Sequence, residues 1–299
     1  MSDNGNSRKT LWTRGRQSTW LRTQGDSFDL DPGRRFSIYL LRRITDRIFF
    51  NAPDGILLKG GLAGRFRTAD ARFTTDIDLH AIDQELAIAH VLDSMRLDLG
   101  DGIIFEEEAL IRKEKPGREN ATKEIATLKL KTTWGGKVEK NPIKIEIVQE
   151  PPALGAEEPR PGLLLPPSEL PLGKVLLYPL AFQIAQKVCG SIELKNGHPS
   201  SRGKDLVDLC LIALTESIDR RDLLQALTVE FENRGISWPA KFSPPDSMRT
   251  SYREGAANSR STALPRSFEA AKDLASSFLW LEEPSAPDLK WNPENLRWE

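Results

Sequence analysis

Asp76 and Asp78 are the residues of this chain best suited to metal chemistry. They are separated by one residue in the segment FTTDIDL, whose alternation of polar and apolar residues predicts a β-strand. Side chains alternate between the faces of a strand, so both carboxylates point the same way and repel each other unless a cation lies between them. Oxygen ligands of this kind suit magnesium. The spacing therefore predicts a divalent-metal site on a rigid element.

Gly60 and Gly61 follow an apolar run from Ile56 to Leu58, which predicts a preceding strand. Because glycine has no Cβ, backbone N–H groups at such a pair can approach a phosphate closely. Strand, glycine pair and paired aspartates in this order predict a site for a metal-bound nucleoside triphosphate. A hairpin with an exposed acidic strand is the alternative that the residues alone leave open.

The order of GG and DxD resembles the polymerase-beta-like nucleotidyltransferase superfamily, in which paired aspartates bind the catalytic metals. The fuller wording, LLKGGLA…R…TTDIDL, resembles the AbiEii/AbiGii-type (MenT-like) nucleotidyltransferase toxins. This resemblance implies an α/β (α+β) fold with a mixed, partly antiparallel sheet, flanking helices and a helical C-terminal domain. It also implies that Asp76 and Asp78 bind Mg²⁺, as two ions, and that an NTP is the substrate.

Glu146 is the third predicted carboxylate. In the segment PIKIEIVQE, Lys144, Glu146 and Val148 share one face of a predicted strand, and the isoleucines share the other. The superfamily carries its third carboxylate on such a neighbouring strand. The resemblance therefore implies that Glu146 is a metal ligand or a base, and a solvated edge strand is the equally weighted alternative.

Two predicted helices carry the remaining family motifs. YPLAFQIAQKVCGS and SSRGKDLVDLCLI resemble the toxins' Y-x-L-x-x-x-x-A-x-K-L and R-x-K-D-L-Y-D-L patterns, with Val207 where the family has Tyr. The resemblance implies functional roles for Lys187, Arg202 and Asp205, and also for Asp208. From the residues themselves, Lys187 lies at the edge of an apolar helical stripe and can project toward the sheet. Early helical aspartates also favour the positive helix end without any catalytic purpose.

The phosphates of the nucleotide need positive partners. Leu62 stands where many superfamily members place Ser or Thr on the triphosphate, which leaves backbone amides and basic side chains. The predicted nucleotide and phosphate ligands are Lys59, Gly60, Gly61, Arg72 and Arg202, with Arg65 and Arg67 as further candidates.

Hydrophobic periodicity predicts the elements that position these residues. Predicted helices run from Arg34 to Phe50, Asp83 to Leu99, Tyr178 to Leu194, Ser201 to Thr215, Asp219 to Arg234 and Arg266 to Leu281. Further strands are predicted from Gly102 to Glu107, Ala126 to Thr132 and Pro142 to Val148. In the first of these helices, the arginines at positions 42, 43 and 47 lie off the apolar stripe.

The chain divides by composition into five segments. They are a basic polar arm (1–33), a nucleotidyltransferase core (34–150), a proline-rich linker (151–173), a helical domain (174–281) and a tail (282–299). Residues 1–50 hold ten Lys and Arg against five Asp, although the net charge of the chain is −1. The arm also carries Trp12 and Trp20, a mixture typical of RNA contact but equally of a loosely docked segment.

Composition excludes several classes of site. Cys189 and Cys210 are the only cysteines and lie in apolar helical patterns, so neither a disulfide framework nor a zinc site is expected. His80, His90 and His198 lack partners at metal-ligand spacing, and we expect structural roles for them. No apolar run approaches the roughly 20 residues that span a bilayer. We therefore expect no membrane association and a cytoplasmic location.

The resemblance implies a specific activity. The protein would be a nucleotidyltransferase toxin of a toxin–antitoxin system that transfers NMP from an NTP to an RNA acceptor, the 3′ end of tRNA. Its partners would be the NTP, this RNA and a cognate antitoxin. Two alternatives stay open: transfer to a protein or small-molecule acceptor, and a non-catalytic nucleotide- or RNA-binding relative.

Overall fold

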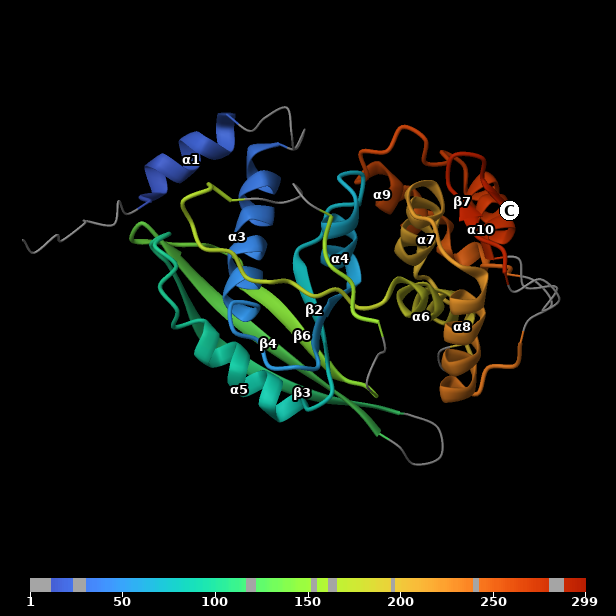
Figure 1. Cartoon of the computed structure of the whole chain (residues 1–299), viewed down its shortest axis with the longest axis horizontal. Helices are drawn as coiled ribbons and strands as arrows, with labels where there is room; N and C mark the ends of the chain where they lie inside the picture. Colours follow the sequence, from blue (N-terminus) through green and yellow to red (C-terminus); the bar gives the residue numbers. More distant parts are fainter. Residues whose placement is uncertain are drawn as a thin grey trace, which may run out of the picture.

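The computed structural model describes residues 12–23, 31–116, 122–151, 155–160, 166–194, 197–238, 242–279 and 288–299. A β-sheet with helices packed against it forms one part of the molecule, and the C-terminal helices lie together beside it (Figure 1). Each part has its own buried apolar cluster. The α/β fold with a following helical part, predicted from the sequence, is confirmed.

The sheet is mixed. Its main path has the order β1-β2-β6-β4-β3, in which β2 and β6 are parallel and the other neighbours are antiparallel. The strands are β1 (Ile56–Lys59), β2 (Asp76–Ala81), β3 (Ile103–Pro116), β4 (Thr122–Trp134), the short β5 (Lys137–Val138) beside β4, and β6 (Ile143–Gln149). The strands β3 and β4 are longer than the sequence pattern predicted.

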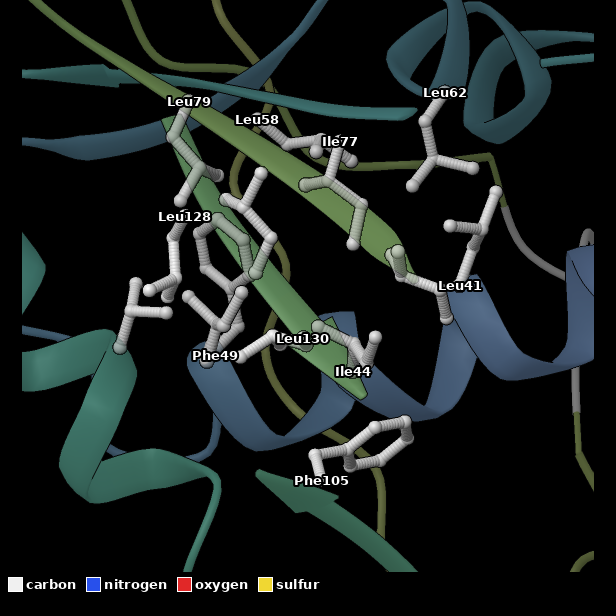
Figure 2. Packing of buried hydrophobic residues seen from close by; sticks show 14 of the residues in the cluster. Leu41, Ile44, Phe49, Leu58, Leu62, Ile77, Leu79, Phe105, Leu128 and Leu130 are labelled. Atoms are coloured by element: carbon white, nitrogen blue, oxygen red, sulfur yellow. The ribbon is translucent and has the colours of Figure 1, made fainter. Parts of the chain in front are cut away.

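One face of the sheet packs into the main hydrophobic core. Ile77 and Leu79 of β2 are fully buried, as are the alternate isoleucines Ile145 and Ile147 of β6. Figure 2 shows residues of this core, including Leu41 and Ile44 of α3 (Pro32–Ile48), gathered between the sheet and the helix. Each such side chain stabilises the fold by about 1.5–3 kcal/mol. The acidic residues that alternate with them must therefore point to the opposite face.

Helix α3 begins two residues earlier than expected because its start is well capped. The side chain of Asp31 accepts a hydrogen bond from the Arg34 backbone N–H at 3.0 Å, and Pro32 occupies the first helical position. Proline has its φ already set for a helix there and loses no backbone hydrogen bond. Helix α5 (Gln84–Ser94) likewise starts after Asp83, whose carboxylate caps the Leu86 N–H.

Arg42, Arg43 and Arg47 of α3 lie off its apolar stripe, and they are nevertheless buried. Arg43 and Arg47 are almost fully buried and converge on Asp101, with N···O distances of 2.7 Å to its two oxygens. Arg42 and Arg43 also pair with Asp46 at 2.7 Å. Asp46, one turn further along α3, and Asp101, distant in sequence, make this burial tolerable, and the apolar periodicity indicated neither pairing.

The C-terminal part is a helical cluster around an apolar core. Its helices are α6 (Leu180–Ile192), α7 (Gly203–Thr215), α8 (Arg220–Arg234), the 3₁₀ turn η1 (Asp246–Met248), α9 (Arg249–Ala257) and α10 (Phe268–Leu279). The sequence pattern predicted all of these except η1 and α9. Cys189 and Cys210 are free, buried thiols of this core, which confirms the absence of a disulfide between them.

The segments outside the two cores are docked against them where the structure describes them. Residues 12–23 contain α1 (Arg14–Thr23), a helix the sequence did not predict, whose Leu21 is buried and whose Gln17 accepts a hydrogen bond from Tyr39. The end of the linker contacts α3, where the Gly173 N–H donates to Asp46, whereas the Arg160 N–H donates to the Phe66 carbonyl. In the tail, β7 (Trp291–Asn292) and β8 (Arg297–Trp298) form a small hairpin with Trp291 buried. In the described ranges, no helix has the length and apolar character needed to cross a bilayer.

Candidate active site

Three ionisable side chains stand in one row across the sheet. Lys59 of β1 pairs with Asp78 of β2, and Asp78 pairs with Glu146 of β6. Directly paired residues place their side chains on the same face. Asp76 lies two residues before Asp78 and shares its face. The family resemblance implied that the carboxylates of Asp76, Asp78 and Glu146 would meet on neighbouring strands. The strand register places these three residues, the carboxylate row, on one face of the sheet.

Asp78 carries its carboxylate next to that of Glu146. Burial, and then the neighbouring Glu146 carboxylate, raise the pKa of Asp78 to about 6, although Lys59 and Lys187 act in the opposite direction. Repulsion between carboxylates that are not fully offset by cations favours a divalent cation held by oxygen ligands. Among the described residues, no group of three or more His, Cys, Asp or Glu side chains is already arranged to hold a metal ion. The donor atoms of the row nevertheless fit Mg²⁺ chemically.

Gly60 is required by its contact with Asp78. Its φ is +71°, and a Cβ on this residue would lie 1.8 Å from the Asp78 Oδ2. Gly61 follows, and a Cβ there would lie 3.1 Å from the Thr74 Oγ1. These glycines start α4 (Gly60–Arg67), so the first N–H groups of this helix lie beside the carboxylate row. Gly60 therefore lets the backbone pass close to the Asp78 carboxylate, and the phosphate contact inferred from the GG motif stays a prediction.

Lys187 of α6 lies between two aspartates of α7. Its Nζ is 2.6 Å from the Asp208 Oδ2 and 3.4 Å from the Asp205 Oδ1. Burial by itself would lower the pKa of Lys187, but these two carboxylates outweigh it and raise the pKa above its ordinary value. Lys187 therefore stays charged. The sequence reasoning gave more weight to Asp205, whereas Asp208 is the nearer partner.

Two predicted phosphate ligands extend this chain of alternating charges. Arg72 binds Asp208 through both oxygens, at 2.9 and 3.1 Å, and the Arg202 Nε lies 2.5 Å from the Asp205 Oδ2. Although burial would raise the pKa of Asp208, Lys187 and Arg72 hold it below its usual range. The cations near the site are thus held in place by carboxylates.

Glu150 is a site residue that the sequence reasoning missed. It directly follows β6, and its Oε2 lies 2.6 Å from the Lys59 Nζ. The other oxygen of Glu150 accepts a hydrogen bond from the Gln186 Nε2 of α6 at 3.1 Å. Gln183, also on α6, donates to the Gly60 carbonyl at 3.1 Å. The alternation that placed Glu146 on the site face also includes residue 150, and this was the signal available in the sequence.

Other candidates have local structural roles. Arg65 donates to the Ala71 carbonyl at 2.5 Å, and Arg67 pairs with Glu157, so neither points its charge at the carboxylate row through these contacts. The His90 Nε2 lies 2.7 Å from the Ile48 carbonyl oxygen, and His80 packs against Tyr178.

A cleft of about 2250 Å³ opens between the sheet and the helical part. Helices α6 and α8 contribute to its walls, and its lining includes Lys59, Gly60, Asp78, Glu146, Lys187, Arg202 and Asp205, but not Asp76, Gly61 or Arg72. Eleven Asp and Glu residues line it, against four Lys and Arg residues. The space is ample for a nucleotide, and the charged residues of its walls are mainly acidic.

Comparisons with known proteins point to one family. The sequence model of the family described as "Nucleotidyl transferase AbiEii toxin, Type IV TA system" matches residues 43–280. A solved structure of a candidate nucleotidyltransferase from H. pylori has 16% identity and a TM-score of 0.46, and the match covers 83% of this chain and 93% of that one. The structure of JHP933 from Helicobacter pylori has 15% identity and a TM-score of 0.43, with 81% and 93% coverage. No curated protein matches the chain.

Proposed function

Because the chain belongs to the AbiEii nucleotidyltransferase toxin family, we propose that it transfers a nucleoside monophosphate from an NTP to an RNA acceptor, the 3′ end of tRNA, with Mg²⁺. The observation that carries this proposal is the alignment of Asp78 with Glu146 beside the glycine-led start of α4, in a cleft that also contains Lys187. The family is one of type IV toxin–antitoxin systems. A cognate antitoxin and a cytoplasmic location are parts of the same proposal.

Asp76, Asp78 and Glu146 are the residues that would hold Mg²⁺. Their hard oxygen donors and the raised pKa of Asp78 support this assignment. The metal, when bound, supplies neutralisation of the charge that develops on the phosphates. The alternative role proposed for Glu146 is that of a base for the attacking hydroxyl, which its place on the face of Asp78 supports.

The cations of the site would bind the triphosphate. Lys187, held charged by Asp205 and Asp208, presents a compact ammonium that stabilises charge on the leaving pyrophosphate. Backbone N–H groups of Gly60 and Gly61 add neutral donors at the start of α4. Lys59, Arg72 and Arg202 complete the proposed set of phosphate ligands.

Asp205 orients Lys187 in this proposal. It lies 3.4 Å from the Lys187 Nζ and is fixed on its other side by Arg202. This contact supports an orienting role over direct activation of the acceptor hydroxyl.

The experiment is incubation of purified protein with each labelled NTP, Mg²⁺ and total RNA. We expect label on RNA of tRNA size, and its loss in Asp76→Ala and in Asp78→Ala. Glu107→Ala, at an exposed position of β3, is the control and should transfer normally. Equal transfer by the double variant Asp76→Ala, Asp78→Ala and by wild type would refute the metal site.

The acidic cleft favours a second candidate function, transfer to a cationic protein or small-molecule acceptor. Phosphate backbones bind positive surfaces, so an excess of acidic residues in the cleft disfavours a polyanion along it. The same assay decides between the two, when basic proteins and hydroxyl-bearing polyamines are added as separate acceptors. Label on one of these and none on RNA would establish the second function.

A further inference from the structure

Lys59 lies directly opposite Asp78 in the sheet, but its ammonium group pairs with Glu150. In the β1–β2 register it faces Asp78, and directly opposed residues have Cβ atoms about 4.5–5.5 Å apart, within reach of a lysine ion pair. Its Nζ instead lies 2.6 Å from the Glu150 Oε2 and 5.8 Å from the centre of the Tyr178 ring. Within the described part of the chain, Lys59 makes no ion pair with Asp78.

Glu150 is held from several sides. Its backbone N–H donates to the Ala81 carbonyl at 3.0 Å, which continues the β2–β6 pairing beyond the end of β6. The Gln186 Nε2 lies 3.1 Å from its Oε1, and the His80 Nδ1 lies 3.4 Å from its Oε2. Its side chain is 7% exposed. Residues of β2 and α6 fix the Glu150 carboxylate, so the flexible Lys59 side chain adjusts its position to reach it.

We propose that Glu150 is a positioning residue that holds the Lys59 ammonium away from Asp78, so that the Asp78 carboxylate stays available to the metal-bound nucleotide. This inference rests on the proposed function, because it assigns Asp78 to the metal. Glu150 touches no reacting atom in this scheme and acts through Lys59. Without its carboxylate, the ammonium would pair with Asp78 across the ladder and compete with the cation.

The test is direct binding of Mn²⁺, a Mg²⁺ substitute, to nucleotide-free protein by calorimetry. Glu150→Gln retains the size of the side chain and an acceptor for Gln186, but loses the charge that holds Lys59. We expect its Mn²⁺ affinity to fall roughly 10- to 100-fold, as is typical when a residue supporting a metal ligand is changed. The Mg²⁺ concentration for half-maximal transfer should rise by a similar factor.

A second change distinguishes positioning from support of the fold. In the double variant Glu150→Gln, Lys59→Met, no ammonium remains to compete, so Mn²⁺ affinity should recover toward the wild-type value. If Glu150 only stabilised the fold, the double variant would bind Mn²⁺ no better than Glu150→Gln alone. Melting temperatures of all variants show whether each is folded.

Glu157→Gln is the matched control. Glu157 also pairs with a buried arginine, Arg67, and caps the start of α6 through the Leu180 N–H, but it faces no residue of the carboxylate row through these contacts. Its Mn²⁺ affinity should equal that of wild type. Equal affinity in Glu150→Gln and wild type would overturn the positioning role alone. Absence of Mn²⁺ binding to wild-type protein would instead overturn the metal site and the proposed function.

Discussion

Replacing Asp78 by Asn should stabilise the metal-free protein at pH 8 while abolishing transfer. The folded protein raises the pKa of Asp78 from its ordinary value of 3.8 to about 6, first through burial and then through Glu146. The folded state therefore holds this proton more tightly than the unfolded state does. Asn has a similar shape and no charge to bury, so the variant removes the cost of the ionised carboxylate.

The direction in which the free energy of unfolding changes with pH follows from proton linkage. Below about pH 4, Asp78 is protonated in both states and contributes no penalty. As the pH rises from about 4 to about 6, the unfolded chain releases the proton more readily, so the free energy of unfolding falls. One pKa unit corresponds to about 1.4 kcal/mol, so the full penalty above pH 6 is about 3 kcal/mol.

The assay is thermal unfolding of wild type and Asp78→Asn, without metal, at pH 4.5 and pH 8. We expect a gain in Tm of about 5 °C for the variant at pH 8 and a gain roughly a third as large at pH 4.5, where the penalty is only partly developed. Mg²⁺ should raise the Tm of wild type at pH 8 but not that of the variant. Asp93→Asn, on the exposed end of α5 with 73% of its side chain accessible, is the control and should change neither value. A variant less stable than wild type at pH 8, or a gain independent of pH, would refute the reasoning.

Three further predictions concern other parts of the molecule. Lys187→Ala and Asp205→Ala should each slow transfer by orders of magnitude, with the double variant scarcely worse; Lys187→Arg should rescue poorly, because a planar fork does not replace a compact ammonium. Near-normal rates in Lys187→Ala would contradict this. Gly60→Ala should abolish transfer, since its Cβ would lie 1.8 Å from an Asp78 oxygen, and full activity would show that the close contact is not used. Asp101→Asn should destabilise the fold by about 3–5 kcal/mol in denaturant unfolding, because it leaves two buried guanidinium groups without their shared carboxylate, and a loss below 1 kcal/mol would disprove that role.

Local patterns were sufficient to predict most regular elements near the site. Alternation predicted β2 and β6, and spacing of about four residues predicted α6 and α7, because each element here exposes one face and buries the other. The pattern failed for α1, whose buried Gln17 and arginine contacts are polar. Tertiary partners, and not an apolar stripe, hold that helix in place.

The sequence by itself determined the carboxylate pair, the glycine turn and the order of the motifs, because these depend on neighbours within one or two elements. Only the tertiary structure decided which charges meet. Glu150 pairs with Lys59, and Asp208 pairs with both Lys187 and Arg72. The paired residues lie 21 to 136 positions apart in the sequence. The strand order and the packing of α6 and α7 set these distances. Pairing of buried charges depends on separations of a few ångströms, which no local pattern along the chain encodes.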